Sequence, residues 1–85
     1  MQVICCSNAG NLFHAYRRQV RRDYRKPLIN LLNKKLLKLR DSCTTFDFLN
    51  NHRFSTVINE EDATINPKEV KKVVITYGQA YYSAL

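Results

Sequence analysis

Pro27 separates two stretches of the sequence that both show the apolar spacing of an amphipathic helix. Apolar side chains recur at three- and four-residue steps across residues 12–24 and again across residues 28–39. The residue before a proline is driven out of helical geometry, whereas proline suits the first position of a helix because its missing N–H would be unpaired there. We therefore predict two antiparallel helices, one over residues 12–25 and one from Pro27 to about residue 41.

Shorter elements flank these helices. The apolar, β-prone stretch 2–6 predicts a short strand or a buried extended arm, and Asn11 is placed to cap the first helix. Apolar and polar residues alternate over 46–48 and over 54–58, which indicates two short strands around a turn. The acidic, polar stretch 59–66 is typical of a solvent-exposed loop.

The last segment carries conflicting signals. Asn66 can cap a helix that begins at Pro67, and Glu69 follows the cap at the spacing of a capping box. The β-branched run Val-Val-Ile-Thr over residues 73–76 suits a strand instead. We predict a C-terminal helix and leave a strand open for residues 70–77. The expected fold is mainly α, with a small α+β arrangement as the alternative, in one small basic domain over residues 1–85.

Positive charge is concentrated in the first half of the chain. Residues 1–43 hold ten Lys and Arg against two Asp, whereas residues 44–85 hold four against five acidic residues. The halves therefore carry +8 and −1, which give the whole-chain charge of +7. A charge concentrated in this way builds a local positive potential and indicates an anionic partner.

Arginines form two rows along the first predicted helix. Arg17, Arg21 and Arg25 follow one another at four-residue steps, and Arg18 and Arg22 form the adjacent row with His14. Neighbouring like charges on a helix repel, while guanidinium groups suit bidentate contact with phosphate. An external polyanion therefore explains these rows better than solubility does.

RNA is the polyanion that we predict, although the charge pattern alone does not separate RNA from other polyanions. The leading hypothesis is a structural, RNA-binding subunit of a ribonucleoprotein assembly of ribosomal type, with neighbouring proteins as further partners and no small-molecule substrate. The predicted contacts with nucleic acid combine the arginine rows with lysines of the second predicted helix: Arg17, Arg18, Arg21, Arg22, Arg25, Lys34, Lys35 and Lys38.

Signals for catalysis are missing from the sequence. No spacing combines a nucleophile, a base and an orienting group, and two glycines cannot build a phosphate-binding loop. Adjacent Cys5 and Cys6 lack the gap of a chelating pair, and the odd cysteine count argues against a disulfide framework. We expect no enzyme, no cofactor, no metal and no membrane span, in a reducing intracellular compartment, either the cytoplasm or the mitochondrial matrix.

The triplet Ala15-Tyr16-Arg17, followed by Arg21, resembles the Leu-Tyr-Arg signature of small mitochondrial LYR-motif proteins. Ala15 stands where the signature has leucine, and the similarity covers the first predicted helix only. The resemblance implies an alternative function, that of a helical accessory subunit of a mitochondrial complex that docks an acidic acyl carrier protein.

Overall fold

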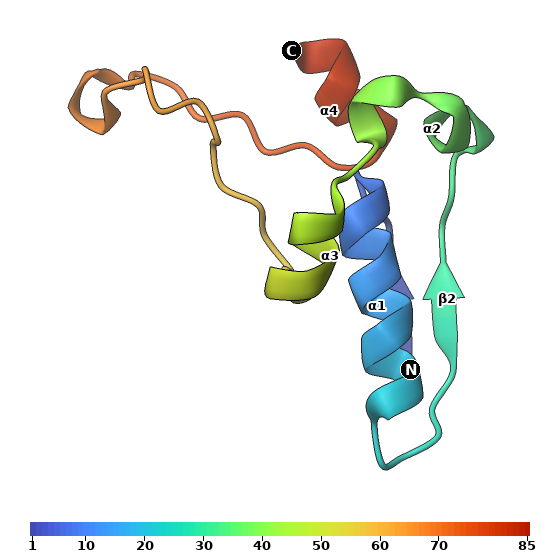
Figure 1. Ribbon diagram of the computed structural model, residues 1–85. Helices are drawn as coiled ribbons and strands as arrows, with labels where there is room; N and C mark the ends of the chain where they lie inside the picture. The colour runs from blue at the N-terminus through green and yellow to red at the C-terminus, as the bar shows by residue number, and fades with distance from the viewer.

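Helix α1, Ala9–Arg21, is the longest element of the computed structural model, which describes residues 1–85. Strand β2 runs along one side of α1 and helix α3 lies along the other (Figure 1). The order of elements is β1 (Gln2–Ile4), α1, β2 (Leu28–Asn30), α2 (Lys34–Lys38), α3 (Phe46–Asn51) and α4 (Gln79–Ala84), with 3-10 turns at Arg40–Ser42 and Pro67–Glu69. Four helices and one short sheet confirm the prediction of a small, mostly helical fold.

The sheet consists of β1 and β2 alone, in parallel. Gln2 pairs with Leu28 and Ile4 with Asn30. Hydrogen bonds extend the ladder at both ends, because the Gln2 N–H donates to the Pro27 carbonyl at 3.0 Å and the Leu31 N–H to the Ile4 carbonyl at 2.9 Å. The strand predicted over residues 2–6 is therefore confirmed at Gln2–Ile4.

The prediction of a second helix from Pro27 to about residue 41 is wrong, and the antiparallel helix pair is not confirmed. Residues 28–30 form strand β2, because pairing with β1 overrides a local helical pattern, and only the five-residue α2 remains helical. Helix α2 begins after Asn33, whose side chain accepts a hydrogen bond from the Lys35 N–H at 3.0 Å.

Helix α1 forms where the spacing predicted it, with different ends and a different buried face. Asn8, not Asn11, is the N-cap, and its side chain accepts from the Asn11 N–H at 2.7 Å. The buried residues are Gly10, Asn11, His14 and Ala15. The predicted apolar face is largely exposed, since small side chains on the opposite face allow closer packing. Its exposed members are Phe13, Tyr16, Val20 and Tyr24.

The two predicted strands around residues 50–51 are also wrong. Residues 46–51 form α3, because Thr45 caps a helix there by accepting a hydrogen bond from the Phe48 N–H at 3.4 Å. Phe48 then stacks on His52, with ring centroids 4.3 Å apart and an interplanar angle of 7°. Residues 54–58 form no strand.

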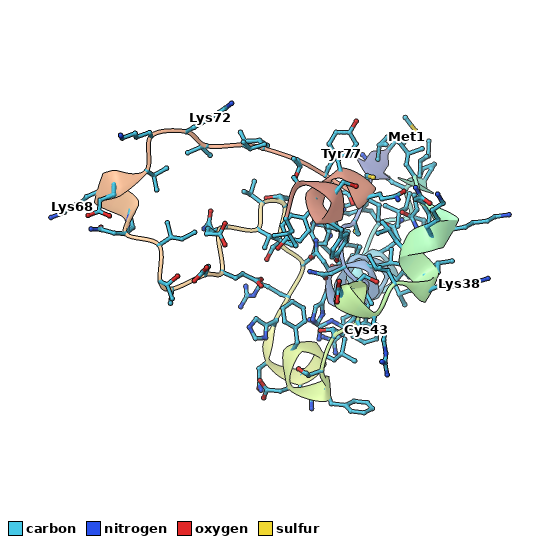
Figure 2. All side chains as sticks on the ribbon, turned by 90° about the horizontal axis from the view of Figure 1, so that it is seen from above. Met1, Lys38, Cys43, Lys68, Lys72 and Tyr77 are labelled. Carbon is cyan, nitrogen blue, oxygen red and sulfur yellow. The ribbon has the colours of Figure 1, made fainter.

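Residues 56–77, which we call the arm, loop out from the rest of the chain and return to it at α4 (Figure 1). Figure 2 shows Lys68 and Lys72 on the arm, distant from Lys38 and Cys43. The helix start predicted at Asn66 is confirmed only as the single 3-10 turn Pro67–Glu69, and residues 70–77 form neither helix nor strand. Gly78, with φ of 57°, turns the chain into α4.

Helix α4 returns the chain to its N-terminal part. The Tyr82 hydroxyl donates to the Ser7 carbonyl at 2.6 Å, and the Asn33 side-chain amide donates to the Gln79 side-chain carbonyl. The apolar core is small: Ile4, Cys6 and Ala15 form its buried cluster, against which Leu12, Leu28 and Phe54 pack. None of the helices combines the length and the apolar character that a bilayer span requires.

Candidate anion-binding groove

A groove lies between α1 and the C-terminal end of α3 together with the chain that follows it. Its volume is about 560 Å³, and no carboxylate lines it. Its side chains come from residues 14–22, in α1 and at its C-terminal end, and from residues 50–54. The lining consists of His14, Arg17, Arg18, Arg21, Arg22, Asn50, Asn51, His52, Arg53 and Phe54.

Two buried side chains of α1 hold the far wall of the groove in place. The Ser55 N–H donates to Asn11 Oδ1 at 2.9 Å, and Asn11 Nδ2 donates to the Ser55 carbonyl at 3.0 Å. His14 Nε2 lies 3.1 Å from the Phe48 carbonyl, which requires Nε2 to carry the proton and donate. The adjacent segment 52–54 is thereby fixed against the arginines of α1.

Arg17 and Arg18 are held by contacts that leave part of each guanidinium free. Arg17 Nη2 donates to the His52 carbonyl at 3.3 Å. Arg18 Nη2 donates to Gln2 Oε1 at 3.1 Å, and its guanidinium carbon lies 3.9 Å from the centre of the Phe54 ring. Arg18 Nε is buried without a hydrogen-bond partner.

The electrostatics of the groove favour a bound anion. Burial lowers the pKa of the Arg18 guanidinium, and the neighbouring charge of Arg22 lowers it further. Arginine nevertheless stays protonated in proteins, so the groove keeps its uncompensated positive charge. A carboxylate or phosphate there would gain charge-assisted hydrogen bonds and reduce the repulsion between the guanidiniums.

Four of the eight predicted contact residues meet in this groove, namely Arg17, Arg18, Arg21 and Arg22. Arg25 lies beyond the end of α1, where Nη1 donates to the Val20 carbonyl at 3.4 Å. Lys34, Lys35 and Lys38 lie on α2 and do not line the groove.

Residues 50–54 are the part of the site that sequence reasoning missed. The sequence pattern predicted only a turn at Asn50-Asn51 between two strands and assigned no role to His52 or Arg53. Two asparagines, a histidine and an arginine in succession are the signal that could have marked this run as a ligand-facing segment.

Metal-binding geometry is not present, since no group of three His, Cys, Asp or Glu side chains comes together. The three cysteines are free, with Cys6 buried, Cys5 half-buried and Cys43 exposed. Burial raises the pKa of the Cys6 thiol, and the adjacent Cys5 raises it further.

Comparison with known proteins gives matches along the whole chain. The chain is 39% identical over 87 residues to a mitochondrial 2-oxoglutarate dehydrogenase of Dictyostelium discoideum. It is 41% identical over 85 residues to the 2-oxoglutarate dehydrogenase E1 component of Haemophilus influenzae. Each match covers 100% of this chain and 9% of the relative. A mitochondrial 2-oxoglutarate dehydrogenase-like protein of Xenopus laevis is 39% identical over 82 residues, 94% of this chain and 8% of its own length.

No family model and no solved structure matches the chain. The resemblance to LYR-motif proteins therefore stays a prediction.

These matches correct the predicted function. The hypothesis of a ribosomal-type RNA-binding subunit is wrong, because the relatives are named as dehydrogenase components. RNA is accordingly withdrawn as the partner. The prediction that excluded an enzyme is contradicted by the same matches. Arginine rows indicate an anionic ligand without specifying its class, so the charge pattern alone did not support RNA over other anions.

Proposed function

We propose that this chain acts as a segment of a 2-oxoglutarate dehydrogenase E1 component, and that its arginine groove binds a small anion in that protein. The observation that carries the proposal is the 41% identity over the full 85 residues to the Haemophilus influenzae E1 component. An intracellular location belongs to the proposal, with cytoplasm and mitochondrial matrix both left open.

The burial pattern supports a segment that works inside a longer polypeptide. Only nine of 85 residues are buried, and the apolar side of α1 faces solvent, with Val20 73% exposed. Apolar patches of this kind mark surfaces that another part of a protein covers. The chain spans about a tenth of the length of its relatives, so dehydrogenase activity would require the remainder of such a polypeptide.

The chemistry of the groove supports the anion. The relatives are named for 2-oxoglutarate, a dicarboxylate, and guanidinium groups bind carboxylates through paired N–H donors. Arg17, Arg18 and Arg22 are only partly exposed, which strengthens their interaction with a bound anion relative to fully solvated side chains. A carboxylate and a phosphate share the acceptor chemistry that this groove requires.

A segment exchange tests the proposal. The matching segment of the Haemophilus influenzae E1 component is replaced by these 85 residues, and 2-oxoglutarate-dependent activity is measured. The expected result is a folded, active chimaera, whereas the isolated chain has no such activity. A segment of the same composition in scrambled order is the matched control and should give no activity. A chimaera that folds and is inactive would contradict the proposed function.

A further inference from the structure

Residues 73–77 form a largely apolar stretch whose apolar side chains are all exposed. Val73 is 78% exposed, Ile75 93% and Tyr77 73%. These side chains lie in succession at the end of the arm, which Figure 1 shows as a drawn-out ribbon leading into α4. Exposure of several large apolar residues in succession is unusual for a soluble surface and indicates a missing partner.

The backbone of the same stretch is also unpaired. The backbone hydrogen bonds of the arm end with the Glu69 N–H, which donates to the Asn66 carbonyl at 3.0 Å, and residues 70–77 take part in none. Residues 73–76 are β-branched throughout, the composition that favours strands. An apolar, β-branched segment with free N–H and C=O groups is able to pair with an open sheet edge.

The alternation of side chains specifies the kind of strand. In extended backbone Val73, Ile75 and Tyr77 point to one face, and Val74 and Thr76 point to the other. Both faces therefore carry β-branched or aromatic side chains, as in strands that are covered on both sides. Gly78, with φ of 57°, ends the stretch sharply and starts α4.

We propose that residues 73–77 join, as a strand, a β-sheet supplied by the rest of an E1-length polypeptide. This inference rests on the proposed function. The relatives are about ten times longer than this chain, so they contain ample polypeptide to supply such a sheet. The chain's own two-stranded sheet pairs only β1 with β2 and does not take up this segment.

Amide hydrogen exchange tests the proposal directly. It is measured for residues 73–77 in the isolated chain, at two protein concentrations, and in the Haemophilus influenzae E1 chimaera that carries the chain. We expect exchange at least about tenfold slower in the chimaera than in the isolated chain. Fast exchange at these residues in an active chimaera would overturn the strand while leaving the proposed function intact. Protection that instead rises with the concentration of the isolated chain would assign the partner to a second copy and also overturn it.

A pair of proline variants gives an independent readout. Ile75→Pro removes a strand N–H, and Val57→Pro is the matched control because Val57 is an exposed, β-branched arm residue whose N–H makes no backbone hydrogen bond. Both variants should leave the melting temperature of the isolated chain unchanged. In the chimaera, only Ile75→Pro should lower it. Equal decreases in the melting temperature of the chimaera for the two variants would contradict the strand. A wild-type chimaera that folds but has no activity would contradict the proposed function and this inference together.

Discussion

Asn11 and Ser55 exchange two hydrogen bonds although they lie 44 residues apart in the sequence. Asn11 Oδ1 accepts a hydrogen bond from the Ser55 N–H, and Asn11 Nδ2 donates one to the Ser55 carbonyl. The side-chain amide thus pairs with the Ser55 backbone as a neighbouring strand would. Asn11 is 6% exposed, so this pairing is shielded on the side of α1. The interaction fixes the position at which the chain leaves the groove and enters the arm.

Replacing Asn11 with alanine should destabilise the isolated chain. Both hydrogen bonds are lost. Because Ser55 is an exposed residue and water can replace part of the lost bonding, we expect a loss of about 1–2 kcal/mol in the free energy of unfolding. Urea denaturation measures it. The control is Asn51→Ala, which removes an exposed hydrogen bond to Asp47 and should cost less than about 0.5 kcal/mol. Equal losses in the two variants would show that the pairing does not hold the fold.

Gly10→Ala should be destabilising despite the better helix propensity of alanine. A Cβ at this position would lie 2.6 Å from the Phe48 ring and 2.8 Å from Thr44 Oγ1. The gain of up to about 1 kcal/mol in propensity is outweighed by an overpacking cost of about 1–3 kcal/mol. Thermal unfolding of Gly10→Ala, Phe48→Ala and the double variant checks this. If the added Cβ clashes with the Phe48 ring, Gly10→Ala should lower the stability less in the Phe48→Ala background than in the wild type.

The stability of the chain should fall at alkaline pH, in part through Tyr82. Burial raises the pKa of the Tyr82 hydroxyl, and Tyr81 and nearby acidic groups raise it further. In the unfolded chain this hydroxyl ionises near pH 10. The contribution of the protonated Tyr82 to the free energy of unfolding is therefore complete below that pH and is lost as the pH rises through the higher pKa of the folded state. Ionisation also removes the proton donated to the Ser7 carbonyl.

Tyr82→Phe should therefore lose less stability than the wild type between about pH 9 and pH 11. Urea denaturation at each pH gives the comparison. Parallel pH profiles for the two proteins would show that Tyr82 does not contribute.

Anion binding to the groove should depend on the arginines of the groove and not on the overall charge. Arg18→Gln/Arg22→Gln should weaken binding of 2-oxoglutarate, of inorganic phosphate, or of both by at least about tenfold, because each lost charged hydrogen bond costs more than about 1.4 kcal/mol. Lys35→Gln/Lys38→Gln is the matched control, since it removes the same charge from α2, outside the groove. Calorimetric titration of each anion separates a carboxylate ligand from a phosphate ligand.

Equal weakening in both double variants would indicate nonspecific attraction by the net charge. That result would contradict a defined anion site in the groove.

Local patterns predicted the elements whose own composition and spacing favour one structure. Helix α1 and strand β1 follow from residue spacing and composition, whereas residues 28–30 also satisfied a helical pattern. What decides their structure is pairing with β1, a nonlocal contact that no local window contains. The face of α1 was misjudged for a related reason, because close packing through Gly10 and Ala15 outweighs the wider apolar stripe.

Only the α1 side of the candidate groove was predictable from the sequence. Arg17, Arg18, Arg21 and Arg22 are visible as rows in the sequence, but the carbonyl that Arg17 contacts belongs to His52, 35 residues further along the chain. The class of anion was not predictable either, because guanidinium rows suit phosphate and carboxylate alike. Similarity to 2-oxoglutarate dehydrogenase sequences, and not the charge pattern, overturned the prediction of RNA.

Turnover of the Haemophilus influenzae E1 chimaera with 2-oxoglutarate is the most direct test of the central claim. We predict a kcat within about tenfold of the parent enzyme, since a functional segment should preserve transition-state stabilisation to within about 1.4 kcal/mol. The scrambled segment should give no turnover. A chimaera that matches the parent in melting temperature and shows no 2-oxoglutarate-dependent turnover would contradict the claim that this chain acts as a segment of an E1 component.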